Sequence, residues 1–309
     1  MKTVLITGGT GLVGAALTET LTRKGYGVII LTRSNHVATS PGVRFARWDV
    51  HRQFIDEASV READCIVHLA GANVAASRWT KERKKEILES RTRSSALLTK
   101  ALQEIENKVS VVVSASAIGW YGPDPVIPNP RPFIETDPAD ASFLGSTCVA
   151  WENSIQEIGN NVRLVILRTG IVLSTEGGAY PEFVKPFRFG VKAILGNGRQ
   201  VISWIHIKDL VNIYVHAIER PELRGVFNAV APEPVSNNQL MEVISEQKKS
   251  TSVSMKVPEF VLKTMLGEMS IEVLKSSTVS AEKITTSGFN FQFGNIQKAV
   301  ANLEDNGQT

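Results

Sequence analysis

The first fourteen residues constrain the fold of this chain more than any other segment. A short apolar run, Val4–Ile6, has the length and β-branched character of a buried strand. A glycine-rich segment, Thr7–Gly14, follows it, and apolar residues then recur with helical spacing. A strand, a glycine turn and a helix in this order are typical of a dinucleotide-binding unit. We therefore predict that this unit binds the pyrophosphate of a dinucleotide.

The three spaced glycines have different predicted roles. Gly8 would make the tight turn, Gly11 would let the pyrophosphate approach the backbone, and Gly14 would let helix and strand pack closely. The phosphates would lie at the helix N-terminus, where free N–H groups favour anions. The alternative is a glycine-rich turn with no ligand. The predicted cofactor-binding residues of this unit are Gly8, Thr10, Gly11, Leu12, Val13 and Gly14.

The end of the second predicted strand indicates which dinucleotide is bound. An acidic residue about 20 residues after the glycines would bond the ribose 2′-hydroxyl of NAD. Here the strand Val28–Leu31 ends in Thr32, Arg33 and Ser34, with no acidic residue. A guanidinium at this point is suited to a 2′-phosphate, so Arg33 and Ser34 favour NADP. The alternative for Arg33 is a solvated surface position.

Two further strand ends carry cofactor candidates. Asp49 follows a predicted strand at 45–48 and lies either at the adenine end of the site or in an ordinary turn. A fourth predicted strand ends at His68, which we expect to be a buried core histidine. The small residues after it allow close approach to the nicotinamide ribose. They are Leu69, Ala70 and Gly71.

The remaining candidates lie on a predicted long helix and on the fifth predicted strand. Arg91 falls within the helix expected over 79–103 and is a cofactor candidate. The strand expected over 109–116 contains Ser114, a cofactor candidate, and Ser116, a catalytic candidate. None of the residues is predicted to bind a metal ion.

Six predicted strands alternate with helices up to residue 173, which specifies an α/β, doubly wound parallel sheet with ligands at the carboxyl ends of the strands. We predict a Rossmann domain at 1–173, with contributions from about 203–231. Residues 174–202 and 232–309 would form a smaller, mainly helical substrate domain. Its predicted helices cover 238–248, 258–275 and 295–303. In the segment that contributes to the Rossmann domain, residues 204–210 are predicted to start a further helix.

Composition excludes several classes of protein. The net charge of +3 over 309 residues is too small to indicate a nucleic-acid partner. The two cysteines, Cys65 and Cys148, lie in apolar segments and indicate reduced thiols. No signal peptide or membrane-length apolar run is evident. We expect a cytoplasmic protein with no membrane partner.

Several motifs resemble those of known proteins. TGGTGLVG, DCIVHLAGAN, SASAIGWYG and ILRTGIVL resemble the extended short-chain dehydrogenases/reductases. Later segments are similar to an epimerase/dehydratase-like, cell-division-inhibitor-like family that has a short C-terminal domain of the DUF1731 type. These segments are RWTKERKKEILESR, GNGRQVISWIHIKDL, FNAVAPEPV, LGEMS and SGFNFQFGNIQKAV. The resemblance covers nearly the whole chain. It implies a Rossmann fold, a nicotinamide dinucleotide cofactor and a small-molecule substrate such as a nucleotide sugar or carbonyl compound, and it allows a homodimer.

The resemblance also implies where the catalytic residues should be. The superfamily uses a Ser or Thr at the end of the fifth strand and a Tyr-x-x-x-Lys pair on the next helix. Ser116 matches the serine. One alignment register places Leu144 and Cys148 at the tyrosine and lysine positions, a second places Cys148 and Glu152 there, and neither supplies the pair. Tyr121 is the tyrosine best placed to substitute. Two functions follow: an NADP-dependent epimerase or oxidoreductase with a non-standard acid/base, or a catalytically silent NADP(H)-binding regulator or redox sensor.

Overall fold

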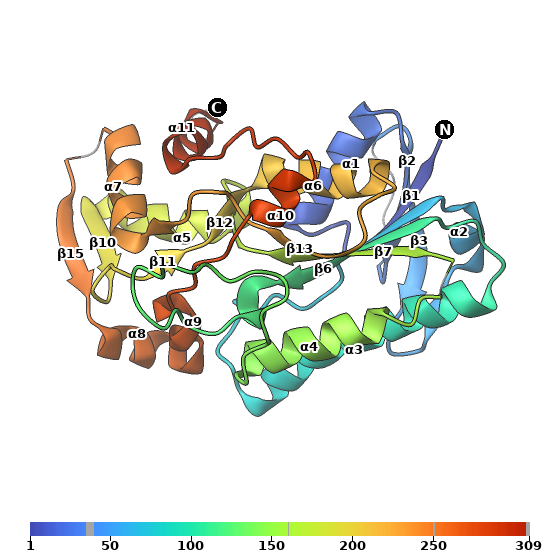
Figure 1. Ribbon diagram of the computed structural model, residues 1–309, viewed down its shortest axis with the longest axis horizontal. Coiled ribbons are helices and arrows are strands. Elements are labelled where there is room, and N and C mark those ends of the chain that lie inside the picture. The colour runs from blue at the N-terminus through green and yellow to red at the C-terminus, as the bar shows by residue number, and fades with distance from the viewer. Residues whose placement is uncertain (35–39, 160, 250, 307–309) are drawn as a thin grey trace.

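A computed structural model describes residues 1–34, 40–159, 161–249 and 251–306 of the chain. Its centre is an eight-stranded sheet in the order β13-β7-β6-β5-β1-β2-β3-β4 (Figure 1). All neighbouring strands are parallel except β3 and β4. The strands are β1 (Thr3–Thr7), β2 (Gly27–Thr32), β3 (Val43–Asp49), β4 (Phe54–Ile55), β5 (Cys65–His68), β6 (Val111–Ala117), β7 (Arg163–Thr169) and β13 (Gly225–Ala229). The predicted doubly wound α/β sheet is confirmed.

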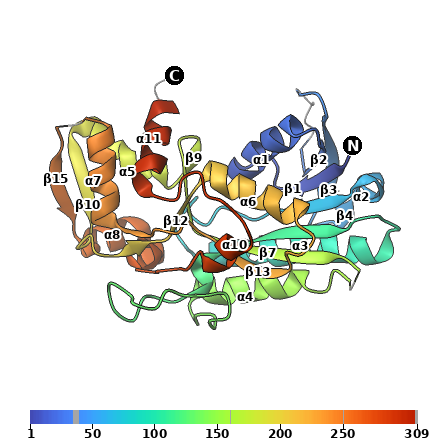
Figure 2. The same ribbon diagram turned by 45° about the horizontal axis from the view of Figure 1, so that its top comes forward.

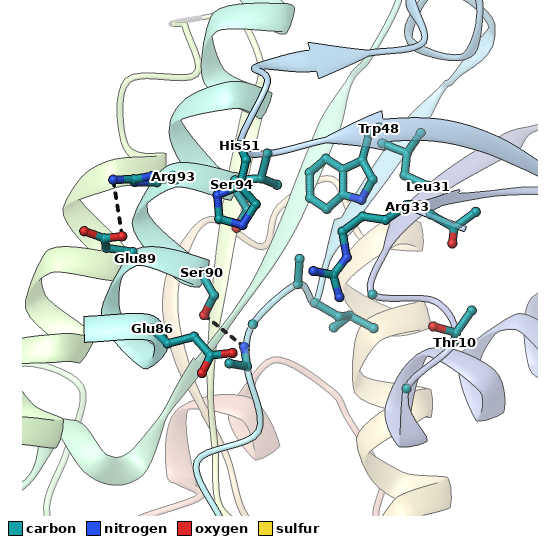
Figure 3. A pocket seen from close by; sticks show the side chains of 18 of the residues that line it. Thr10, Leu31, Arg33, Trp48, His51, Glu86, Glu89, Ser90, Arg93 and Ser94 are labelled. Carbon is teal, nitrogen blue, oxygen red and sulfur yellow. Dashed lines mark hydrogen bonds and ion pairs between the residues drawn. The ribbon is translucent and has the colours of Figure 1, made fainter. Parts of the chain in front are cut away.

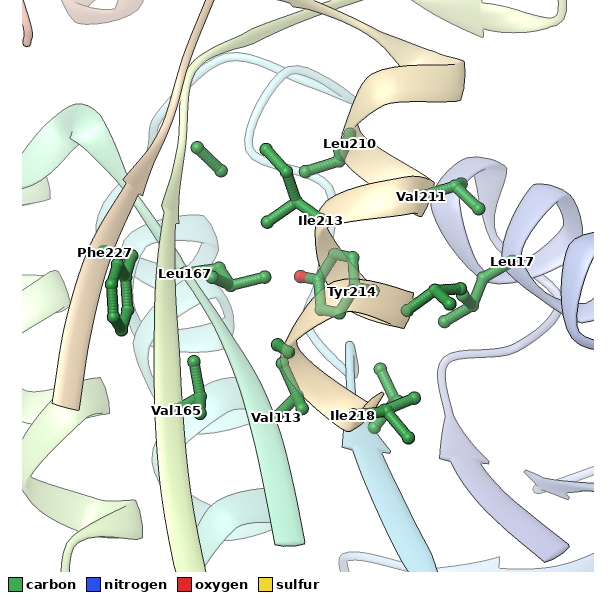
Figure 4. Close-up of a cluster of buried hydrophobic side chains, with 14 of the residues drawn as sticks. Leu17, Val113, Val165, Leu167, Leu210, Val211, Ile213, Tyr214, Ile218 and Phe227 are labelled. Carbon is green, nitrogen blue, oxygen red and sulfur yellow. The ribbon is translucent and has the colours of Figure 1, made fainter. Parts of the chain in front are cut away.

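Helices cover both faces of this sheet. One face carries α1 (Leu12–Arg23), α6 (Ile207–Glu219) and α10 (Glu282–Thr286), and the other carries α2 (Glu57–Glu62), α3 (Lys81–Glu104) and α4 (Phe143–Ile155) (Figures 1 and 2). Alternate strand residues supply separate cores on the two sides, so that Ile6 packs in one and Leu5 in the other. In Figure 4, Ile213 and Tyr214 of α6 lie over Leu167 of β7 in the first core. This alternation explains why the strands read as continuous apolar runs.

A smaller part of the molecule lies beyond the carboxyl ends of these strands, at the left of Figure 1. Its own core includes Tyr180, Ile194, Leu240 and Val300. The elements of this region are β8 (Ile171–Ser174), β9 (Gly177–Gly178), α5 (Tyr180–Val184), η2 (Lys185–Phe189), β10 (Val191–Leu195), β11 (Val201–Ile202), β12 (Trp204–His206), β14 (Val235–Ser236), α7 (Asn237–Gln247), β15 (Val253–Val257), α8 (Glu259–Leu266), η3 (Gly267–Met269), α9 (Ser270–Leu274) and α11 (Ile296–Asn306). A short 3-10 turn, η1 (Ile118–Trp120), follows β6 in the main sheet.

Three local predictions are corrected. Residues 204–206 form a strand, and the helix begins only at Ile207. The helix predicted over 258–275 is interrupted where Gly267 adopts a positive φ of 62°. Residues 253–257 form a strand, β15, that was not predicted. In each case short-range apolar spacing was insufficient, because pairing with a distant strand or one glycine decided the structure.

A proline-rich loop at residues 123–138 contacts the C-terminal region through hydrogen bonds and a β-bridge. The buried carboxylate of Asp124 accepts hydrogen bonds from Asn129 Nδ2, Ser276 Oγ, Thr278 N and Thr278 Oγ1 at 2.7–2.9 Å. Phe133 forms an isolated parallel bridge with Val279. The segment after α9 therefore holds this loop against the main sheet. None of the helices in the described ranges is long and apolar enough to cross a membrane.

Candidate cofactor-binding site

Two glycines in the turn between β1 and α1, Gly8 and Gly14, lie where a Cβ atom would overlap neighbouring backbone atoms. Gly8 has a φ of 71°, and a Cβ built on it would lie 2.9 Å from the carbonyl carbon of Leu69. A Cβ on Gly14 would lie 2.4 Å from the carbonyl oxygen of Gly8. A Cβ on Gly11 would meet only that same oxygen, at 3.4 Å. Gly8 and Gly14 therefore allow the close packing, and Gly11 leaves the outer side of the turn open.

The N-terminus of α1 faces this open side. Gly11 is the N-cap residue and has no side-chain oxygen to accept from the first N–H groups. The first turn also contains no acidic side chain. The backbone N–H groups of Leu12 and Val13 therefore remain suited to an anion such as a pyrophosphate. Leu12, Val13 and Gly14 contribute backbone here and do not line the adjoining pocket with side chains.

The neighbouring turn after β5 is held by buried hydrogen bonds. Thr7 Oγ1 accepts from the backbone N–H groups of Leu69 and Ala70 at 3.1 and 3.2 Å. His68 Nδ1 lies 2.7 Å from Thr7 Oγ1, and its Nε2 lies 3.1 Å from Ser95 Oγ. Burial lowers the pKa of His68 to about 4, so the imidazole is neutral. The prediction of a satisfied core histidine is confirmed, and this histidine positions the turn.

Helix α3 holds the same turn from the other side. Ser90 Oγ accepts from Ala72 N at 2.9 Å. Arg91 Nη1 donates to Ala72 O at 3.1 Å and to Ile87 O at 2.9 Å, and its guanidinium packs on the Trp151 ring at 4.8 Å. A Cβ on Gly71 would lie 3.1 Å from the guanidinium carbon of Arg91. Arg91, predicted as a cofactor residue, therefore supports the turn from behind and does not line the pocket.

A pocket of about 660 Å³ lies between the two turns, the ends of β2 and β3, and α3 (Figure 3). This volume suits a large organic ligand. Predicted residues that line it are Gly8, Thr10, Gly11, Arg33, Ser34, Leu69, Ala70 and Gly71. Sequence reasoning missed the others, which include Thr32, Trp48, Val50, His51, Ser90, Arg93 and Ser94. Trp48 and His51 lie within two residues of Asp49 in the sequence, so the prediction of Asp49 as a cofactor residue could have been extended to them.

Arg33 extends into the pocket beside Trp48 (Figure 3). Ser34 N donates to Thr32 Oγ1 at 3.2 Å, which orders the end of β2. Among the described residues, no carboxylate lies within ion-pair distance of Arg33. A guanidinium that lines a pocket without a protein anion is suited to a phosphate.

Two other predicted cofactor residues do not reach the pocket. Asp49 accepts from His51 N at 3.0 Å and Arg52 N at 3.1 Å, and the bond from Arg52 lowers the pKa of Asp49. Asp49 is therefore a turn residue that positions His51. Ser114 is buried within β6, and its hydroxyl donates to Ala115 O at 3.2 Å. The geometry therefore does not support Asp49 and Ser114 as cofactor ligands.

Ser116 belongs to a buried polar cluster at the ends of β6 and β7. Its Oγ donates to Glu152 Oε1 at 2.6 Å. Glu152 also receives two bonds from Arg168, from Nε to Oε1 at 2.9 Å and from Nη2 to Oε2 at 3.0 Å. All three side chains are buried. The hydroxyl proton of Ser116 is thus already donated to a carboxylate within the protein.

Tyr121, predicted as a substitute acid, is fully buried. Its hydroxyl donates to Asn228 Oδ1 at 2.7 Å and accepts from Arg168 Nη1 at 3.1 Å. Burial raises the pKa of Tyr121 to about 12. The hydroxyl does not face an open site, so the prediction of a proton-donating role is corrected: Tyr121 is a structural residue.

Leu144 and Cys148 lie where the resemblance places the tyrosine and lysine. A Cβ on Gly119 would lie 3.1 Å from Leu144 Cβ and 3.8 Å from Cys148 Sγ. The Cys148 thiol lies 3.6 Å from Ala117 O and donates to it, and burial raises the pKa of Cys148 to about 11. An apolar side chain and a neutral thiol therefore occupy this part of the site. No cluster of metal-ligating side chains was found among the described residues.

Comparison with known proteins agrees with this geometry. A profile of the "NAD dependent epimerase/dehydratase family" matches residues 4–229, which form most of the chain. The chain belongs to this family. Residues 257–303 match a second profile, "Domain of unknown function (DUF1731)".

Proteins described as epimerases or epimerase family proteins match nearly the whole of this chain. The epimerase family protein YfhF of Bacillus subtilis is 32% identical over 302 residues, which are 97% of each chain. The crystal structure of human epimerase family protein SDR39U1 with NADPH has a TM-score of 0.88 at 28% identity and covers 98% of this chain and 99% of its own. A nucleoside-diphosphate sugar epimerase from Corynebacterium glutamicum has a TM-score of 0.75 at 30% identity, over 99% of this chain and 60% of its own.

Proposed function

We propose that this chain binds NADP(H), and that Arg33 and Ser34 recognise the 2′-phosphate of its adenosine. The observation that carries the proposal is the Arg33 guanidinium in the pocket at the end of β2, where an NAD-binding protein would have an acidic residue. A bidentate guanidinium–phosphate contact is strong and favours the doubly charged 2′-phosphate over a hydroxyl. The NADPH in the structure of the human relative supports the same cofactor.

The residues of this chain fit the rest of the cofactor. The backbone at Gly11–Val13 would hold the pyrophosphate, because the α1 N-terminus has no capping side chain. The pocket wall at Trp48 and His51 would accept the adenine end. The turn Leu69–Gly71, fixed by Thr7 and His68, would support the nicotinamide ribose.

Bound NADP(H) supplies a hydride donor or acceptor, and the chain supplies the proton chemistry around it. The Ser116 proton is donated to Glu152, Tyr121 is enclosed, and Leu144 and Cys148 occupy the Tyr and Lys positions. We therefore propose, first, that the protein is an NADP(H)-binding regulator or redox sensor with little turnover of its own. The free, buried state of both cysteines fits the cytoplasmic location that we propose with it.

A second candidate function is an NADP-dependent epimerase or oxidoreductase with a non-standard acid/base. The 30% identity with the protein described as a nucleoside-diphosphate sugar epimerase favours it. In this case the substrate would be a nucleotide sugar or another carbonyl compound. Ser116 would have to exchange its bond to Glu152 for one to the substrate, because proton transfer needs direct contact.

Titration of the protein with NADPH and NADH, followed by nicotinamide fluorescence and calorimetry, tests the proposal. We expect tight binding of NADPH, and we expect Arg33→Ala to weaken it about 10- to 100-fold while changing NADH affinity less than threefold. Arg52→Ala is the matched control, because Arg52 is an exposed arginine on a nearby turn. Equal losses for both nucleotides would contradict the role of Arg33, and no binding of NADPH would overturn the proposal.

An assay for substrate turnover distinguishes the regulator or redox sensor from the epimerase or oxidoreductase. Protein saturated with NADPH or NADP would be incubated with a panel of nucleotide sugars and carbonyl compounds. Hydride transfer or epimerisation that depends on Ser116 would favour the enzyme. Tight binding with no turnover across the panel would favour the regulator.

A further inference from the structure

Strand β15 lies at the outer end of the C-terminal region, far from the cofactor pocket (Figures 1 and 2). Within the part of the chain that the structure describes, β15 forms a two-stranded parallel sheet with β10 alone. Its other edge faces away from the molecule. Val253 and Met255 are 72% and 55% exposed, although both are apolar. An open edge with exposed apolar side chains is a template for pairing with another strand.

The hydrogen bonds to β10 show which backbone groups face outward. Val253 N donates to Gly190 O at 2.9 Å, and Val257 O accepts from Gly196 N at 2.9 Å. Backbone groups of successive residues in a strand point to opposite edges. The N–H and C=O groups of Ser254 and Lys256 therefore point away from β10, toward the open edge.

The side chains of this small sheet divide by face. In the register of β10 and β15, Lys192 and Ile194 of β10 lie beside Ser254 and Lys256. Lys192 pairs with Glu242 of α7, and Ile194 belongs to the buried core, so α7 covers the β10 part of this face, whereas Ser254 and Lys256 are exposed. The opposite face is apolar throughout. It consists of Val191, Ala193, Leu195, Val253, Met255 and Val257.

This pattern is self-complementary about Met255. In an antiparallel pair centred on Met255, Ser254 lies opposite Lys256 of the other copy, and each such pair can exchange two backbone hydrogen bonds. Val253 then lies opposite Val257 on the apolar face, and no lysine faces a lysine.

The outer surface of the long helix α3 differs from this edge. Several of its exposed charged side chains are paired along the helix, with Lys85 and Arg93 near Glu89 and with Lys100 near Glu104. The charged groups on such a surface are paired with one another or hydrated, and they need no protein partner. The edge of β15 instead combines unpaired backbone with apolar side chains.

We propose that the open edge of β15 binds β15 of a second copy of this chain, antiparallel and centred on Met255, to form a continuous four-stranded sheet. The contact is isologous, so it closes a two-fold dimer in which the open edges of both β15 strands are paired. This interface does not involve the cofactor pocket, and the inference is independent of the proposed function. Because the interface is small, we expect a Kd of about 10–100 μM.

Sedimentation equilibrium over a range of protein concentrations tests the dimer. Lys256→Pro removes an outward N–H without removing a bond to β10. We expect it to raise the dimer Kd at least tenfold. Lys256→Ala keeps that N–H and is the matched control, with less than a threefold change expected. NADPH titration and circular dichroism would show that both variants are folded.

A cross-link tests the register without depending on the proline variant. Met255 would face Met255 of the partner as a non-hydrogen-bonded pair, with the Cα atoms about 4.5 Å apart, a separation that a disulfide can span. Met255→Cys should therefore form a covalent dimer on mild oxidation, whereas Phe54→Cys, at another exposed apolar position, should not. A monomer at about 500 μM, or cross-linking no faster than that of Phe54→Cys, would overturn the proposal. Dimers unaffected by Lys256→Pro would show that another surface is used and would overturn it as well.

Discussion

One absent methyl group has different consequences at Gly11 and at Gly14. At Gly14 the missing Cβ makes room for the carbonyl of Gly8, which would be 2.4 Å away. At Gly11 the backbone has a φ of −81° and a ψ of 174°, values that alanine adopts without strain. The first glycine leaves space for a ligand, and the second leaves space for the protein itself.

Alanine substitutions should separate these two roles. Gly14→Ala should lower the free energy of unfolding by about 3 kcal/mol, because the Cβ overlaps the backbone of the turn. Gly11→Ala should change it by less than about 1 kcal/mol but weaken NADPH binding tenfold or more, because the methyl group projects where the pyrophosphate would lie. Urea unfolding and fluorescence titration measure both quantities. A normal NADPH affinity in Gly11→Ala would show that the ligand does not approach this residue.

Protonation of His68 links pH to stability. Its pKa is about 4 in the folded protein and about 6.5 in the unfolded chain. Above pH 6.5 both states are neutral and the group has no effect on stability. As the pH falls from 6.5 to 4, the unfolded chain gains a proton that the folded protein excludes, so stability is lost.

Comparison with His68→Gln isolates this effect. Glutamine does not titrate. As the pH falls from 7 to 4, the unfolding free energy of the wild type should therefore decrease by roughly 3 kcal/mol more than that of the variant. His206, whose pKa is also lowered to about 4 by burial, contributes equally to both proteins. Urea denaturation at a series of pH values measures the difference. Parallel pH profiles would show that His68 is not the titrating group.

At the scale of secondary-structure elements, a buried ion pair connects β6, β7 and α4. Arg168 of β7 donates two hydrogen bonds to Glu152 of α4, and Ser116 of β6 donates a third. The guanidinium also lies 3.6 Å from the centre of the Trp120 ring. Because each charge depends on the other for compensation, removing one partner costs more than removing both.

Variants of this pair should therefore be non-additive. Arg168→Met should lower the free energy of unfolding by about 3–5 kcal/mol, since it leaves the Glu152 carboxylate buried without its counter-charge. The double variant Glu152→Gln/Arg168→Met should recover part of that loss. Ser116→Ala should cost only about 1–2 kcal/mol and leave NADPH affinity within threefold. Additive effects in urea denaturation, or a large loss of NADPH affinity in Ser116→Ala, would contradict this account.

At the scale of the whole molecule, polar contacts join the C-terminal region to α3 and to the loop before it. Arg78 Nε donates to Met265 O at 2.9 Å, and its Nη2 donates to Thr264 O. These carbonyls belong to the last turn of α8, where the helix leaves them unpaired. Lys84 also forms an ion pair with Glu268. The position of α8 therefore depends on Arg78, which follows the turn Leu69–Gly71 in the chain.

Arg78→Ala should loosen this connection without unfolding the main sheet. Amide hydrogen exchange in α8 should accelerate about tenfold or more, because the last turn loses its cap. NADPH affinity should change less than threefold, since Arg78 does not line the pocket. Arg61→Ala, which removes an exposed ion pair with Glu57 on α2, is the control. Unchanged exchange in α8 would show that other contacts hold this region.

Local patterns in the sequence alone determined the strand–glycine–helix unit, the alternation of strands with helices and the position of Arg33 after β2. These features depend on residues close together in the chain, where apolar spacing and glycine placement dictate the backbone. For the same reason, Gly8, Gly11 and the turn Leu69–Gly71 could be assigned to the pocket before any fold was known.

Only the tertiary structure decided which side chains face the site and which are enclosed. Trp48 and Ser90 line the same pocket although they lie on β3 and α3. Ser116 and Tyr121 were predicted as catalytic residues, but their hydroxyl groups donate hydrogen bonds to Glu152 and Asn228, which lie 36 and 107 residues away in the chain. Such pairings depend on packing between distant segments, and no spacing within one segment encodes them.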